Sequence, residues 1–116
     1  MDVLIAEDHA VTAKLIAKHL QSKTDINLVG IAKDGENAVS EVLKKHVDVI
    51  LMDVNMPFMD GIKAAEKILK SKPDVKVLFL SVHTEPWIIK QTINVGGAGY
   101  VSKKHGFNKI YDAIVT

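Results

Sequence analysis

The stretch VDVILMDVNMPFMDG, from Val47 to Gly61, decides which fold we expect. It contains a short apolar run, Val49–Met52, that lacks the polar alternation of a half-exposed strand. Such a run is typical of a strand buried on both faces of a parallel sheet. Asp53 ends the run, although a buried and uncompensated carboxylate is destabilising or becomes neutral. We therefore expect Asp53 to be solvated, paired or chemically active.

The same kind of apolar run recurs along the chain and alternates with segments of helical spacing. The other runs are Val3–Ala6, Leu28–Ala32, Val77–Leu80 and the weaker Tyr100–Val101. Between and after them, apolar residues recur three or four positions apart, which predicts one buried face per helix. The predicted faces consist of Val11, Leu15, Ile16 and Leu20; Ala38, Val39, Val42 and Leu43; Ile62, Ala65, Ile68 and Leu69; Ile88, Ile89 and Ile93; and Phe107, Ile110, Tyr111 and Ile114.

Capping and breaking residues mark the boundaries of these helices. Asp34-Gly35 and Asp60-Gly61 stand where the second and third helical segments begin. Pro86 falls in the first turn of the fourth, where its missing N–H costs little. Gly96-Gly97 can end that helix, because glycine tolerates a positive φ.

Five alternating strands and helices predict an α/β fold with a doubly wound, five-stranded parallel sheet. Right-handed crossovers place helices on both faces of such a sheet. The expected strand order is 2-1-3-4-5, the flavodoxin-like arrangement, with the switch point between the first and third strands. Half of a barrel is the alternative, but it would leave two long sheet edges open.

Composition fits one domain and excludes several classes of function. The chain has 116 residues, is 47% hydrophobic and carries a net charge of +1, which indicates neither a nucleic-acid nor a membrane partner. It has no cysteine, and hence no disulfide or thiolate metal site. No apolar run approaches the roughly 18 residues of a membrane span, and no signal peptide is evident, so we expect a cytoplasmic protein. All basic residues are lysine, so a phosphate partner must be bound by lysine or backbone N–H groups.

Polar residues follow the apolar runs at the carboxyl ends of the predicted strands. Glu7-Asp8 follows the first run, Asp53 the third, Ser81 the fourth, and Ser102-Lys103 the fifth. Ligands of such sheets bind at this edge, near the switch point. Carboxylates gathered there need a cation, and with oxygen ligands alone Mg²⁺ is the expected one. In that company Asp53 can act as a nucleophile toward phosphorus, with Lys103 and Ser81 contacting the phosphoryl oxygens.

Four segments together carry a resemblance to a known family. They are AEDH (residues 6–9), LMDVNMPFMDG (51–61), LFLSVH (78–83) and GYVSKK (99–104). In order and spacing, the chain resembles the receiver domain of bacterial two-component response regulators over nearly its whole length. The EDH after the first strand is most similar to the NarL/FixJ (LuxR-type) subfamily.

The resemblance implies a role for each matching residue. Asp53 matches the phosphoacceptor, and Lys103 matches the lysine that pairs with the phosphoryl group. The implied Mg²⁺ ligands are Glu7, Asp8, Asp53 and the backbone carbonyl of Asn55. Ser81 matches the switch hydroxyl and Tyr100 the switch aromatic, while Asn55 and His83 occupy positions that tune the lifetime of the phosphoryl group.

The resemblance also implies partners and a domain arrangement. A histidine kinase would donate the phosphoryl group, and the helix 4–strand 5–helix 5 face would switch in response. Residues 1–116 would form the receiver domain, which catalyses only its own phosphorylation and dephosphorylation and is otherwise no enzyme. It would control a transcription-regulating output domain, absent from this chain, through which alone DNA would be contacted. A homodimer formed on phosphorylation is compatible with this arrangement, and no membrane partner is expected.

Other interpretations remain open at this stage. An aspartate-dependent phosphohydrolase also places an aspartate after a strand, but it usually carries a second aspartate two residues on, where this chain has Asn55. A phosphorylation-independent protein-binding module is a further alternative. Glu7-Asp8 could instead cap a helix, and Trp87 could belong either to the core or to a partner surface. The histidines share no metal-ligand spacing, so His9 and His83 are expected only to line the rim.

Overall fold

The computed structural model describes residues 1–54, 56, 59–81, 86–102 and 107–115, with the side chains of residues 107 and 108 left out. Within these ranges strands and helices alternate, as the sequence predicts. The elements are β1 (Asp2–Ala6), α1 (Ala10–Gln21), β2 (Asn27–Ala32), α2 (Gly35–Lys44), β3 (Val49–Asp53), α3 (Gly61–Ser71), β4 (Lys76–Ser81), α4 (Pro86–Asn94), β5 (Gly99–Ser102) and α5 (Phe107–Val115).

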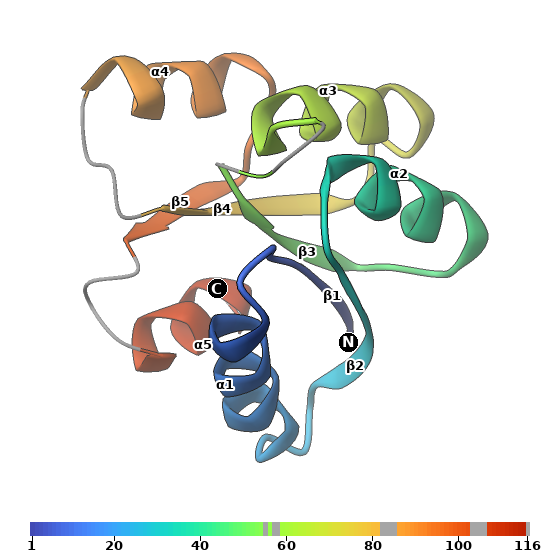
Figure 1. The fold of residues 1–116 in the computed structure, drawn as a ribbon, viewed down its shortest axis with the longest axis vertical. Helices are drawn as coiled ribbons and strands as arrows, with labels where there is room; N and C mark the ends of the chain where they lie inside the picture. The colour runs from blue at the N-terminus through green and yellow to red at the C-terminus, as the bar shows by residue number, and fades with distance from the viewer. Residues whose placement is uncertain (55, 57–58, 82–85, 103–106, 116) are drawn as a thin grey trace.

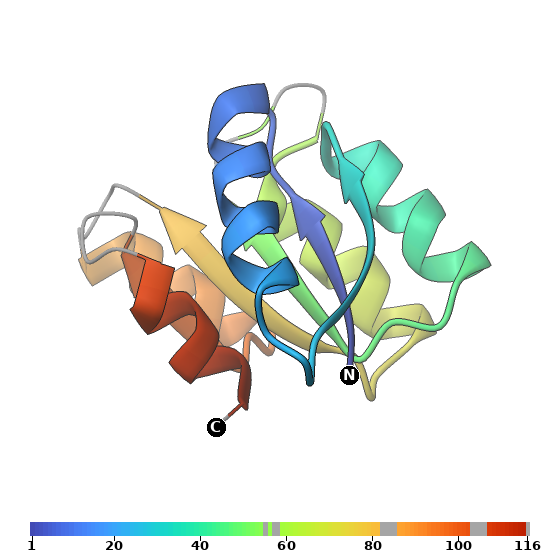
Figure 2. The same ribbon diagram turned by 90° about the horizontal axis from the view of Figure 1, so that it is seen from below.

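The strands form one parallel sheet in the order β2-β1-β3-β4-β5, which confirms the predicted topology. Helices α1 and α5 cover one face of the sheet, and α2, α3 and α4 cover the other (Figure 1). The view from below shows the same three layers, with the sheet between the two sets of helices (Figure 2). None of the helices within the described ranges has the length and apolar character needed to cross a bilayer.

The core consists of two apolar layers, one on each face of the sheet. Strands β1, β3 and β4 contribute to both layers and are almost wholly buried, as their continuous apolar runs predict. The prediction is wrong for β2, where only Ala32 is buried. The reason is its place at the edge of the sheet, where it pairs with β1 alone.

The predicted helix boundaries are confirmed by the capping contacts. The Asp34 side chain accepts a hydrogen bond from the Asn37 backbone N–H at 2.8 Å, and Asp60 accepts one from Lys63 at 2.9 Å. Pro86 is the first residue of α4. Gly96 follows that helix with a φ of +93°, the left-handed conformation that ends helices.

The predicted buried faces of the helices are only partly correct. On α1 the buried residues are Ala13, Ile16, Ala17 and Leu20. Val11 and Leu15 are instead 72% and 49% exposed. The alanine side chains end at Cβ, so α1 can pack closely on the sheet through them. The buried face of the helix is therefore rotated from the face that the large side chains alone predict. Leu43 and Ile93 are likewise exposed, and Trp87, for which the sequence left both core and surface open, is 62% exposed.

Candidate functional site

Three carboxylates meet where β1 and β3 end. Asp53 is the last residue of β3, and Glu7 and Asp8 directly follow β1, which pairs with β3 up to Ala6 and Met52. Carboxylate oxygens of Glu7, Asp8 and Asp53 lie within 4.8 Å of one another. We call these three residues the acidic cluster. Glu7 and Asp53 are 2% and 4% exposed, whereas Asp8 stands at the solvent side.

Backbone hydrogen bonds and close packing hold the acidic cluster in place. The N–H of Glu7 donates to the carbonyl oxygen of Ala32 at 3.0 Å, which ties the cluster to the end of β2. The N–H of Val54 donates to Leu80 at 3.0 Å, and the N–H of Gly61 donates to Val54 at 2.9 Å. A Cβ at Gly61 would overlap the carbonyl oxygen of Asp53. Glycine therefore lets α3 begin directly against the phosphoacceptor candidate.

The acidic cluster has the composition of a site for a hard divalent cation. Two unit charges about 4 Å apart repel by roughly 4 kcal/mol at an effective dielectric constant near 20. A divalent cation among the carboxylates offsets that repulsion. Carboxylate oxygens, supplemented by carbonyl groups and water, are the ligands that Mg²⁺ prefers. The donor atoms present thus fit Mg²⁺.

His9, which the sequence placed only at the rim, lies next to the acidic cluster. His9 Nδ1 lies 3.6 Å from Glu7 Oε2 and 3.5 Å from Asp8 Oδ1, within the same group of possible metal ligands. His9 is also the N-cap residue of α1, so the interpretation of Asp8 as the cap is wrong. Its side chain makes no capping hydrogen bond, and its backbone N–H donates to Glu7 Oε2 at 3.3 Å.

Ser81 and Tyr100 lie on the neighbouring strands. Ser81 ends β4 and is 1% exposed, and it is opposite Ser102 in the β4–β5 register. Tyr100 is half-buried opposite Phe79, and its hydroxyl is buried without a hydrogen-bond partner in the part of the chain that the structure describes. The remaining candidates, Asn55, His83 and Lys103, lie outside the described residues.

The comparison with known proteins decides the family. The protein-family model described as the response regulator receiver domain matches residues 3–115 of this chain. This chain belongs to that family. Response regulator UvrY of Escherichia coli K12 is 38% identical over 114 residues, covering 98% of the chain and 52% of UvrY. Transcriptional regulatory protein DegU of Brevibacillus brevis is 33% identical and is covered over 48% of its length. The receiver domain therefore spans about half the length of these curated relatives.

Solved structures agree with the assignment to the receiver family. The signal receiver domain of the putative response regulator NarL from Mycobacterium tuberculosis has a TM-score of 0.93 at 31% identity, with 98% of this chain and 92% of that one covered. A CheX–CheY–BeF₃–Mg²⁺ complex from Borrelia burgdorferi contains a similar chain, with a TM-score of 0.92 at 25% identity and coverages of 99% and 87%. Receiver domains are signalling modules rather than conventional enzymes.

A second polar cluster lies at the opposite end of the receiver domain's sheet. His46 Nδ1 lies 2.8 Å from Asp2 Oδ2, and its Nε2 lies 3.5 Å from Asp48 Oδ1. The hydrogen bond to Asp2 and the charge of Asp48 raise the pKa of His46, although desolvation and then the charge of Lys72 oppose them. Hydrogen bonds from Asn27 and then from His46 lower the pKa of Asp2. The side chain of His46 is 74% exposed.

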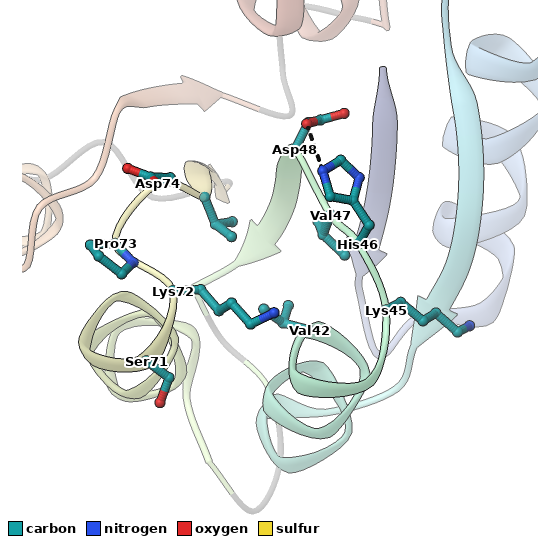
Figure 3. Close-up of a pocket in the computed structure, with 10 residues that line it drawn as sticks. Val42, Lys45, His46, Val47, Asp48, Ser71, Lys72, Pro73 and Asp74 are labelled. Carbon is teal, nitrogen blue, oxygen red and sulfur yellow. Dashed lines mark ion pairs between the residues drawn. The ribbon is translucent and has the colours of Figure 1, made fainter.

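This second cluster borders a cavity of about 340 Å³ between the last turns of α2 and α3. Figure 3 shows the His46–Asp48 pair on one wall, with Lys72 extending across the cavity toward Val42 while Lys45 points away. The cavity is lined by none of the acidic cluster's residues. We therefore treat this end of the sheet as a structural feature that is separate from the candidate site.

Proposed function

We propose that this receiver domain is the phosphoacceptor switch of a two-component response regulator, phosphorylated on Asp53 by a histidine kinase. The observation that carries the proposal is the acidic cluster itself. Asp53 ends a buried strand with its carboxylate within 4.8 Å of Glu7 and Asp8. Such a site suits phosphoryl transfer, which depends on positioning and on charge neutralisation.

Mg²⁺ is the proposed cofactor, held by the acidic cluster together with the backbone carbonyl of Asn55. When bound, it neutralises negative charge on the phosphoryl oxygens and aligns the reacting groups. The donor set supports this choice, because three of the four groups gathered there are carboxylates. The related complex from Borrelia burgdorferi contains Mg²⁺ together with BeF₃⁻.

The residues of this chain divide the transfer step between them. A carboxylate oxygen of Asp53 forms a bond to phosphorus while the bond from phosphorus to the imidazole nitrogen of the kinase breaks. The kinase histidine takes back the electron pair, and Asp53 becomes an acyl phosphate. Lys103 is proposed to neutralise the transferred group, and Ser81 to donate a hydrogen bond to it. Asn55 and His83 are proposed to govern how long the acyl phosphate survives.

Phosphorylation is proposed to shift the face formed by α4, β5 and α5. Ser81 ends the strand beside β5, and Tyr100 on β5 keeps a buried hydroxyl with no partner among the described residues. A hydroxyl in that state favours a rearrangement that would give it a partner, since a buried polar group without one is destabilising. The added charge then biases two arrangements of the same face.

The switched face is proposed to act on a second copy of the chain or on an output domain. Trp87 and Ile93 of α4 are 62% and 66% exposed, so this helix already presents apolar surface. The receiver domain corresponds to about half of UvrY and DegU. We propose that residues 1–116 form the receiver unit of a cytoplasmic regulator whose remaining part, a helix-turn-helix domain, binds DNA.

Incubation with acetyl phosphate and Mg²⁺ tests the proposed function. The expected result is an intact-mass gain of one phosphoryl group in the wild type and none in Asp53→Asn. Asp48→Asn is the matched control, because Asp48 precedes the same strand at its opposite end and should leave the gain intact. An equal gain in Asp53→Asn, or none in the wild type, would contradict the proposal. Steady phosphate release from a phosphomonoester would favour a phosphohydrolase instead.

A further inference from the structure

The imidazole of His9 lies among the atoms that are proposed to hold the metal. Its Nδ1 is 3.5 Å from Asp8 Oδ1 and 3.6 Å from Glu7 Oε2. Glu7, Asp8, His9 and Asp53 each offer one ligand atom, and these four atoms all lie within 4.8 Å of one another. Metal–ligand bonds of about 2.1 Å place neighbouring ligands of an octahedral ion about 3.0 Å apart and opposite ligands about 4.2 Å apart. The two His9 distances exceed the spacing of neighbouring ligands by about 0.5 Å, so small side-chain rotations can bring Nδ1 and these carboxylates to one ion.

Neither helix capping nor burial explains the position of the His9 side chain. His9 is the N-cap residue of α1, yet its side chain makes no capping hydrogen bond. Serine, threonine, aspartate and asparagine are the residues that stabilise this position. The side chain is also 74% exposed, so it contributes little to packing. An imidazole at this position is therefore not accounted for by helix capping or by burial.

The local backbone fixes the ring beside the carboxylates. Glu7, Asp8 and His9 are consecutive, and the N-cap residue is extended, with φ −80° and ψ 108°. The backbone N–H of His9 donates to Glu7 Oε2 at 3.3 Å, so the same carboxylate contacts both the backbone and the ring of His9. Because the ring is exposed, a small rotation about its side-chain bonds can bring Nδ1 closer without disturbing the core.

We propose that His9 is a further metal ligand through Nδ1, which shifts the selectivity of the site from Mg²⁺ toward Mn²⁺ and Zn²⁺. Carboxylate, carbonyl and water ligands suit Mg²⁺, whereas an imidazole nitrogen favours transition metals and zinc. A site of three carboxylates and one imidazole thus binds these ions more tightly than an all-oxygen site does. The inference rests on the proposed function, since it takes the acidic cluster to be the metal site.

Calorimetric titrations with Mg²⁺, Mn²⁺ and Zn²⁺ test the selectivity. The measured quantity is the ratio of the Mn²⁺ or Zn²⁺ affinity to the Mg²⁺ affinity. Removing even an indirect partner of a metal ligand costs about tenfold or more in affinity, so His9→Ala should lower both ratios at least about tenfold. His46→Ala is the matched control, because its side chain is equally exposed, at 74%, and lies beside two carboxylates at the other end of the sheet.

Long-range ¹H–¹⁵N spectra of the histidine rings test the assigned atom. On adding Zn²⁺, the Nδ1 resonance of His9 should shift at an equivalence of one ion, and the shift should be absent in Asp53→Asn. Unchanged affinity ratios in His9→Ala, or ratios that fall in His46→Ala instead, would overturn the inference. So would a Zn²⁺-dependent shift confined to His46.

The two proposals fail in different ways. If acetyl phosphate and Mg²⁺ phosphorylate the wild type while the ratios are the same in His9→Ala, the inference about His9 is wrong and the phosphoacceptor proposal stands. If the wild type binds none of the three ions and gains no phosphoryl group, both proposals are wrong.

Discussion

Replacing Gly61 with alanine should destabilise the receiver domain and disturb the acidic cluster together. A Cβ at this position would overlap the carbonyl oxygen of Asp53 and lie 2.9 Å from Met52 Cγ. Gly61 is the first residue of α3, where alanine alone would be favoured over glycine by up to about 1 kcal/mol. Overpacking typically costs about 1–3 kcal/mol. The main overlap is with the backbone carbonyl of Asp53, so no change of side-chain rotamer relieves it. The cost of overpacking should therefore lie near the upper end of that range.

The net effect of Gly61→Ala is then a loss of about 2 kcal/mol, or roughly 8 °C in Tm for a domain of this size. Thermal unfolding measures the loss, and a Mg²⁺ titration of the folded variant should show weakened binding. Gly30→Ala is the matched control, since a Cβ there would meet only side-chain atoms, with the flexible Lys45 Nζ nearest at 3.3 Å. A Gly61→Ala protein as stable as the wild type, with unchanged Mg²⁺ affinity, would refute this reasoning.

Three further predictions concern the metal site, pH and the core. Mg²⁺ at 100 times its Kd should raise the free energy of unfolding by about 2.7 kcal/mol. Asp8→Asn should lose most of this stabilisation, and EDTA should remove it from the wild type. The pKa of His46 is raised in the folded state by Asp2, so its stabilisation is fully present below the unfolded pKa near 6.5 and is lost as pH rises through the folded pKa. His46→Gln should therefore lower Tm at pH 5.5 and have little effect at pH 9, and an equal loss at both would contradict the assignment. Ile16→Ala should cost about 2–5 kcal/mol, whereas Leu15→Ala should change stability by less than about 0.5 kcal/mol in denaturant unfolding; the reverse order would contradict the observed face of α1.

The strands were predictable wherever burial is two-sided. In β1, β3 and β4 nearly every side chain faces one of the two core layers, so the apolar run is unbroken and its meaning is clear. Strand β2 has an apolar sequence too, but its exposure depends on its place at the sheet edge. The predicted strand order already places β2 at that edge, so the order, rather than the apolar run, decides its exposure.

The helix faces were predictable only where large side chains dominate the contact. On α1 the spacing of Val11 and Leu15 suggested a face that the structure leaves exposed. Ala13 and Ala17 form the contact instead, since small residues permit a close approach to the sheet. A hydrophobic pattern gives alanine little weight, so the pattern places the buried face of α1 incorrectly.

The carboxylates of the candidate site were predictable because the fold dictates where strands end. Once the sheet order is known, Glu7, Asp8 and Asp53 must lie at one edge. The sequence also placed His9 at this rim, but it did not predict that the imidazole would join the possible ligands, because the histidines share no metal-ligand spacing. The available signal was a histidine at a helix start, where a capping residue is the norm.

The most direct test of the central claim is to locate the phosphoryl group within the chain. The wild type is incubated with acetyl phosphate, with Mg²⁺ or with EDTA, reduced with borohydride to trap the acyl phosphate, digested and sequenced by mass spectrometry. Modification of Asp53 alone, and only when Mg²⁺ is present, is the predicted result. Modification at another residue, or equal modification of Asp53 in EDTA, would contradict the claim that the acidic cluster holds a divalent ion beside the phosphoacceptor.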